Sequence, residues 1–146
     1  MFLASGSQAA INRDFENYHF YWFISDRMKT VLERFDPEAF AFLKCRVQLP
    51  NGKEGPVRWL CDVLPVLDAL DEEQSEVRIA IGQDGSKCYA LVGWLGPKIF
   101  KDDVVGAHLI FRMMYAEQTV VCTEEVKLAC KAAGLTGLSF FDPNKH

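Results

Sequence analysis

The feature that most constrains the fold of this chain is a series of short apolar segments with a period of two, separated by turn-forming residues. Apolar and polar residues alternate over 44–49 and again over 58–63, as on strands with one buried face. Asn51-Gly52 and Asp84-Gly85 are typical turn sequences. Further candidate strands are 77–81, 88–94, 109–113, 119–122 and 138–141. These patterns predict a mostly antiparallel sheet.

Helical patterns are few and short. Ser25 can cap a helix at its N-terminus, and the next residues place Met28, Val31, Leu32 and Phe35 on one face. Asp36-Pro37 suits the start of a second, short helix, with Phe40 and Phe42 as its core anchors. Thr123 can cap a third helix, which Gly134 would end in a left-handed conformation.

The fold class predicted from these elements is α+β, with a mostly antiparallel sheet and a few short helices. The chain has 146 residues, of which 49% are hydrophobic, and this composition excludes a disordered chain. We expect a single domain over residues 1–146, with residues 1–17 loose. The aromatic run from Tyr18 to Ile24 is expected to be a strand buried on both faces.

The cysteines and histidines show no catalytic or metal-binding pattern. The five cysteines include no C-x-x-C pair, and Cys45, Cys61 and Cys122 lie in apolar runs, so we expect buried thiols. We expect His19 and His108 to be partly buried structural imidazoles. Dinucleotide and P-loop fingerprints do not occur in the sequence, and we expect neither a cofactor nor a metal.

The predicted location is the cytoplasm. The N-terminus lacks the basic and apolar regions of a signal peptide. The apolar runs are shorter than the about 20 residues that a membrane helix requires, so we expect a soluble protein without a membrane partner. The odd number of cysteines fits a reducing compartment.

The net charge of −4 disfavours nucleic acid as a partner, and the charge is local. Between Trp59 and Val77 the sequence has no base and six acids: Asp62, Asp68, Asp71, Glu72, Glu73 and Glu76. The rest of the chain has 14 acids and 16 bases. Two interpretations stay open for this acidic segment. It is either a solvated loop with a helix start or a docking patch for a basic partner.

The candidate partner-binding residues are five of these acids and two aromatic residues near turns: Asp68, Asp71, Glu72, Glu73, Glu76, Trp94 and Tyr115. Aromatic side chains often dominate interface energies, although a core role is the alternative for Trp94 and Tyr115. For Arg112, the alternative to a partner contact is a structural ion pair with the acidic segment.

Several segments in a fixed order carry a family resemblance. They are Ser25-Asp26-Arg27-Met28-Lys29, Phe40-Ala41-Phe42-Leu43, Val66-Leu67-Asp68-Ala69-Leu70-Asp71, Ile110-Phe111-Arg112-Met113 and the run from Ala132 to Phe140. In this order, from about Phe20 to Phe141, the chain resembles the eleventh immunity family of bacterial polymorphic toxin systems, formerly a domain of unknown function.

The resemblance implies a non-enzymatic protein that binds and neutralises a cognate toxin. It brings no catalytic residues. An alternative is a ligand-binding or enzymatic α+β domain, whose site would combine residues distant in sequence and lie in a deep pocket with a buried carboxylate or histidine. A third hypothesis is a homo-oligomer that associates through the aromatic strand from Phe20 to Ile24.

Overall fold

The computed structural model of the chain describes residues 1–6, 13–90 and 96–144. In chain order, the elements are β1 (Phe2–Gly6), β2 (Phe15–Tyr18), β3 (Tyr21–Ser25), α1 (Asp26–Phe35), the 3-10 helix η1 (Pro37–Ala39), β4 (Phe40–Cys45), β5 (Arg58–Val63), β6 (Val66–Leu67), β7 (Arg78–Ile81), β8 (Lys87–Ala90), α2 (Asp102–Val105), β9 (Ile110–Met113), β10 (Ala116–Cys122), α3 (Glu124–Ala132) and β11 (Leu138–Phe141).

These strands form two sheets and a separate hairpin. The first sheet has the order β11-β1-β10-β9-β6, the second has the order β2-β3-β5-β4, and β7 pairs with β8. Every pairing between these strands is antiparallel except that of β6 with β9. The predicted α+β class with a mostly antiparallel sheet is therefore confirmed. None of the helices in the described part is long and apolar enough to cross a membrane.

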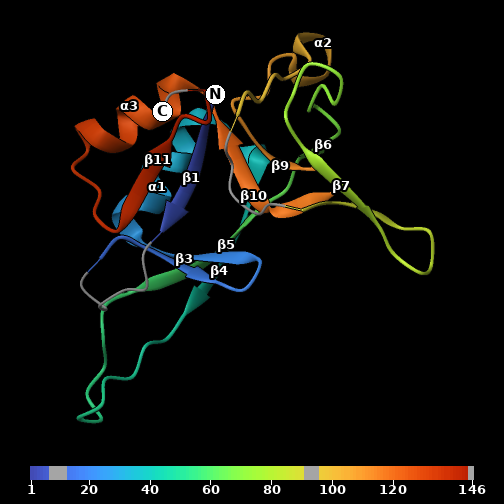
Figure 1. Cartoon of the computed structure of the whole chain (residues 1–146). Helices are drawn as coiled ribbons and strands as arrows, with labels where there is room; N and C mark the ends of the chain where they lie inside the picture. The colour runs from blue at the N-terminus through green and yellow to red at the C-terminus, as the bar shows by residue number, and fades with distance from the viewer. Residues whose placement is uncertain (7–12, 91–95, 145–146) are drawn as a thin grey trace.

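The main core lies where the two sheets meet the helices α1 and α3. These helices contact each other and lie beside β1 and β11 (Figure 1). The core contains Met28 and Leu32 of α1, Val126 and Cys130 of α3, and residues of both sheets. A second apolar cluster covers the other face of β9 and β10. The β7–β8 hairpin and the loop between β4 and β5 extend away from this body (Figure 1).

The helix α1 begins and packs as predicted. The Ser25 hydroxyl accepts a hydrogen bond of 3.1 Å from the Met28 amide, which satisfies one of the amides that a helix N-terminus leaves unpaired. The predicted face is buried at Met28 and Leu32 and half-buried at Val31 and Phe35. The Asp36 carboxylate then caps η1 through the Glu38 amide at 3.0 Å, so the second helix start is also confirmed.

The Asp14 carboxylate ties the ends of the helices to β2. It accepts hydrogen bonds from the Ser25 hydroxyl at 2.6 Å, an Arg27 nitrogen at 2.6 Å and the Thr136 amide at 2.8 Å. Arg27 also donates to the carbonyls of Ala133 and Gly134, at the end of α3. Burial alone would raise the pKa of Asp14, but the bonds from Arg27, Ser25 and Thr136 outweigh it and hold the pKa well below its usual range.

The end of α3 follows the sequence prediction, and its start does so in part. Gly134 has φ of +65°, a left-handed conformation that glycine adopts without strain. Thr123 stands at the N-cap with an extended backbone. Its hydroxyl is buried and has no hydrogen-bond partner in the described part of the structure, so the predicted side-chain cap does not form.

Residues 1–17, which we expected to be loose, include the strands β1 and β2. The strand β1 lies inside the first sheet, where Leu3 is paired with Val121 of β10 on one side and with Phe141 of β11 on the other. Phe15 of β2 is completely buried. Backbone hydrogen bonds to two neighbouring strands fix β1, although its sequence is too short to show a period.

The aromatic run from Tyr18 to Ile24 is a hairpin and not one strand buried on both faces. Tyr18 of β2 is paired with Tyr21 of β3, and the turn between them has His19 at φ of +55°. Trp22 and Ile24 are buried, whereas Tyr18, Phe20 and Tyr21 are exposed. The chain reverses here without glycine or proline, which is why the sequence pattern indicated a continuous strand.

The predicted hairpin of 44–49 with 58–63 is confirmed, with the second strand at the predicted residues and the first strand displaced toward the N-terminus. The first strand is β4, Phe40–Cys45, and it pairs with β5 along its whole length. Phe40 and Phe42 therefore lie on this strand, with their rings stacked 5.7 Å apart, and they do not belong to the preceding helix. The predicted strand 88–94 is described only as far as Ala90.

Candidate partner-binding surface

Arg112 joins the acidic segment, residues 62–76, to the β2–β3 turn. Its side chain is almost completely buried and forms an ion pair of 3.1 Å with Asp62. The guanidinium also donates to the carbonyls of Val63 at 2.9 Å, Glu117 at 2.8 Å and Phe20 at 2.5 Å. The structural interpretation of Arg112 is therefore correct, and Asp62 is an internal partner.

Two further acids of the segment hold local structure. The Asp71 carboxylate accepts hydrogen bonds of 3.1 Å from the amides of Glu73 and Gln74, and these bonds lower its pKa, with the bond from Gln74 contributing most. Residues 72–74 form a turn and not the predicted helix start. Glu72 forms an ion pair with Lys87 and accepts a bond of 2.8 Å from the Tyr89 hydroxyl, and both contacts lower the pKa of Glu72.

The remaining acids, Asp68, Glu73 and Glu76, are exposed. Glu76 packs against Gly96, since a Cβ atom at this glycine would lie 1.7 Å from the Glu76 Oε2. Its amide also donates to the Pro97 carbonyl at 2.8 Å. Within the described residues, the carboxylates of Asp68 and Glu73 have neither a hydrogen bond nor an ion pair. The segment thus contains both structural and exposed carboxylates.

The structure describes one of the two aromatic candidates, Tyr115, and not the other, Trp94. Tyr115 lies in the β9–β10 turn with φ of +69° and is half-buried against Tyr89, with the ring centroids 5.6 Å apart. The Lys87 Nζ lies 4.5 Å from the centroid of the Tyr115 ring, a cation–π contact. Tyr115 thus connects the β7–β8 hairpin to the body. Trp94 lies outside the residues that the structure describes.

The most exposed aromatic group, which we call the aromatic turn, consists of Tyr18, His19, Phe20 and Tyr21. The sequence pattern indicated Phe20 and Tyr21 only as part of a strand for self-association, and no turn was expected here. Phe20 is 52% exposed and lines a surface hollow of about 230 Å³. The other residues around this hollow are Tyr89, Ala116, Glu117 and Gln118. The available signal was the polar groups of Tyr18, His19 and Tyr21, which suit an exposed position better than a strand buried on both faces.

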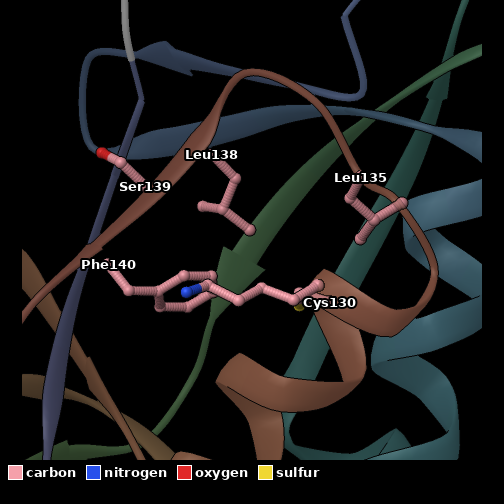
Figure 2. A pocket seen from close by; sticks show the side chains of 6 residues that line it. Cys130, Leu135, Leu138, Ser139 and Phe140 are labelled. Carbon is pink, nitrogen blue, oxygen red and sulfur yellow. The ribbon is translucent and has the colours of Figure 1, made fainter.

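A second hollow, of about 310 Å³, lies between the end of α3 and β11. Leu135, Leu138 and Phe140 gather around it together with Cys130 (Figure 2). Burial raises the pKa of the Cys130 thiol to about 11, so this thiol is not an activated nucleophile. The lining also includes Lys131 and Ser139, and it contains neither a histidine nor a carboxylate.

A third hollow, of about 410 Å³, lies beside the loop between β4 and β5. Its lining consists of Lys44, Cys45, Arg46, Val47, Glu54, Gly55, Pro56 and Val57. Glu54 is exposed. None of these three hollows is lined by a histidine or a buried carboxylate, which is the arrangement that the enzymatic alternative requires.

The histidines and cysteines have structural or surface positions. His19 and His108 are exposed, so the expectation of partly buried imidazoles on strands is wrong. His19 lies in a turn, and the His108 Nδ1 is 2.9 Å from the Val105 carbonyl oxygen. All five cysteines are free thiols, and burial raises the pKa of Cys61 and Cys122 to about 12. Cys45 is only half-buried, contrary to expectation.

The described residues contain no group of three or more His, Cys, Asp or Glu placed to hold a metal ion. The fold and these surfaces define a small α+β protein with an acidic segment and an exposed aromatic turn. The sequence profile of the immunity protein family Imm11 matches residues 1–145, and the chain belongs to this family. No curated protein matches the chain.

Proposed function

We propose that this chain is a non-enzymatic immunity protein that binds a cognate protein toxin and blocks its activity. The observation that carries the proposal is membership of an immunity family over nearly the whole chain. The three hollows have neither the histidine nor the buried carboxylate that the enzymatic alternative requires, and this supports binding over catalysis.

The acidic segment is the proposed contact for a cationic surface of the toxin. Its exposed carboxylates, Asp68, Glu73 and Glu76, would face the toxin, while Asp71 and Glu72 hold the turn that presents Glu73. Complementary charges of this kind increase the association rate and the specificity more than the affinity itself. Trp94 remains a predicted aromatic anchor, near a turn in the sequence.

The main test uses the toxin encoded beside this gene. Coexpression should rescue cells from the toxin, and the two purified proteins should form a stoichiometric complex in size-exclusion chromatography with light scattering. If the toxin of the adjacent gene is neither neutralised nor bound, the proposed function is wrong.

A separate test addresses the acidic segment. The double variant Asp68→Lys/Glu73→Lys should associate about tenfold more slowly than the wild type at low salt, and the difference should shrink at high salt, because exposed charges are screened. A matched control is Glu54→Lys/Glu125→Lys, which makes the same charge change at exposed positions outside the segment. Equal association rates for the two variants would favour the other interpretation, in which the acidic segment is a solvated loop that does not contact the toxin.

A further inference from the structure

The aromatic turn and the β9–β10 turn border the same hollow. Phe20 of the first turn and Ala116, directly after the second, both line it. Within the described residues, the two non-glycine residues with positive φ are His19 and Tyr115, one in each turn. Such conformations are uncommon for non-glycine residues and concentrate at functional sites.

A buried side chain anchors the backbone of the aromatic turn. Arg112 donates to the Phe20 carbonyl at 2.5 Å and, from the same guanidinium, to the Glu117 carbonyl at 2.8 Å. In the strands of the same hairpin, the buried rings of Phe15 and Trp22 pack edge to face with centroids 5.0 Å apart. A rigid display of aromatic side chains loses little conformational entropy on binding, and aromatic residues are frequent hot spots of interfaces.

The charged groups around the hollow favour a cation as its occupant. Glu117 is an exposed carboxylate on its rim, and the charge of Asp68 lies close enough to Tyr89 to contribute to the raised pKa of this hydroxyl, although burial is the main cause. The neighbouring basic groups already have partners, because Arg112 is paired with Asp62 and Lys87 with Glu72. The local excess of charge is therefore negative.

The size of the hollow favours a single side chain over a small molecule. Its volume of about 230 Å³ is below the roughly 300–1,000 Å³ of most small-molecule sites. The residues that line it include two aromatic residues, Phe20 and Tyr89, and the acidic Glu117. A lysine or arginine side chain matches this combination, because its cation interacts with aromatic faces and its alkyl part packs against apolar atoms.

We propose that the hollow between these two turns receives a protruding lysine or arginine side chain of the cognate toxin, which packs against Phe20, while the exposed rings of Tyr18 and Tyr21 contact the toxin surface around it. This inference rests on the proposed function and names a contact surface in addition to the acidic segment. The aromatic turn supplies the contact area, and Glu117 supplies the charge that selects a basic residue.

The test measures dissociation constants by calorimetry with the purified toxin encoded beside this gene. Phe20→Ala should weaken binding about 30-fold or more, as expected for a hot spot. Glu117→Gln should weaken it about tenfold and reduce its salt dependence, because a charge-assisted contact is lost. Leu43→Ala and Leu128→Ala are matched controls, since these residues are 64% and 55% exposed elsewhere on the surface, and both should stay within about twofold of the wild type.

The outcomes separate this inference from the proposed function. Absence of binding by the wild type contradicts the proposed function itself. Binding by the wild type with unchanged affinities of Phe20→Ala and Glu117→Gln overturns only the inference. If Phe20→Ala weakens binding and Glu117→Gln does not, the proposal that the occupant is a cation is wrong. A wild-type dimer in light scattering that Phe20→Ala dissociates would show that a second copy of the chain covers the turn, which also overturns the inference. Circular dichroism must show that each variant is folded.

Discussion

The acidic segment and the aromatic turn show opposite relations between sequence and surface. The acidic segment has six carboxylates, and an ordinary expectation places all of them in solvent. Three of them nevertheless have internal partners: Asp62 with Arg112, Asp71 with the turn amides, and Glu72 with Lys87 and Tyr89. The aromatic turn has three large rings that the sequence pattern placed in a strand buried on both faces, yet all three are exposed.

The difference teaches that residue type alone does not separate structural from exposed groups in this protein. The decisive contacts are distant in sequence. Arg112 lies 50 residues from Asp62 and 92 residues from Phe20, and one guanidinium binds both. This side chain therefore makes one group structural and fixes the other at the surface. The predictions below test this division between structural and exposed groups.

The largest expected effect on stability distinguishes Trp22 from Phe20, two residues of the same aromatic run. Trp22→Ala should lower the free energy of unfolding by about 3–5 kcal/mol, because Trp22 is only 4% exposed and packs on Phe15. Phe20→Ala should lower it by less than about 1 kcal/mol, since Arg112 binds the Phe20 carbonyl and not its ring. Urea unfolding of both variants checks the prediction. Similar losses would mean that the aromatic turn is part of the core.

The next effect concerns the guanidinium that both regions share. Arg112→Met should lower the free energy of unfolding by about 3 kcal/mol or more, because it leaves buried carbonyls and Asp62 without their donor. Arg112→Lys should lose less than Arg112→Met, since it keeps the charge but not the fork of donors. Hydrogen exchange should also show faster opening of the β2–β3 turn in Arg112→Met. An unchanged exchange rate there would contradict the role of Arg112 in fixing the turn.

Elements with local signals could be predicted from the sequence. The start of α1 depends on Ser25 and the nearby Met28 amide, and the face formed by Met28 and Leu32 follows from their spacing. The end of α3 at Gly134 and the hairpin of β7 with β8 are equally local. The physical reason is that caps, turns and apolar periods act within a few residues.

Elements that depend on distant partners could not be predicted. The strand β1 is defined by β10 and β11, which lie at the other end of the chain. The strand β6 has two residues and exists because it pairs in parallel with β9, so it shows no period. The turn at His19 has no glycine, and its left-handed backbone is held by Arg112.

The candidate site shows the same limit, because its local features could be predicted from the sequence and its long-range contacts could not. The number of acids located the segment from Asp62 to Glu76, because a charge count needs only the sequence. It could not separate Glu72 from Glu73, since the partner of Glu72 is Lys87, 15 residues further along the chain. The hollow beside Phe20 combines three separate stretches of sequence, and no local pattern indicates it.

Asp14 lies outside the acidic segment, and its carboxylate has a structural role. It serves as a reference for the structural acids of the segment. Asp14→Asn should lower the free energy of unfolding by about 2 kcal/mol at pH 7, because hydrogen bonds to a charged group are lost. The folded-state pKa of Asp14 lies below its ordinary value. Its stabilisation is therefore complete above pH 4–5 and decreases as the pH falls below about 4, toward the folded-state pKa. The gap between wild type and Asp14→Asn in urea unfolding should narrow from pH 5 to pH 2.5. A constant gap over this range would contradict the assignment.

The smallest effect distinguishes two adjacent acids of the segment. Glu72→Gln should lower the free energy of unfolding by about 1 kcal/mol, because it weakens the contacts with Lys87 and Tyr89 at a partly exposed site. Glu73→Gln should change it by less than about 0.5 kcal/mol, since its side chain has no partner in the described residues. With the toxin the order should reverse, because the exposed Glu73 is available to a cationic surface while Glu72 is bound internally. A larger loss of association rate in Glu72→Gln would show that the ion pair with Lys87 opens on binding, and the division between structural and exposed acids would then hold only for the unbound protein.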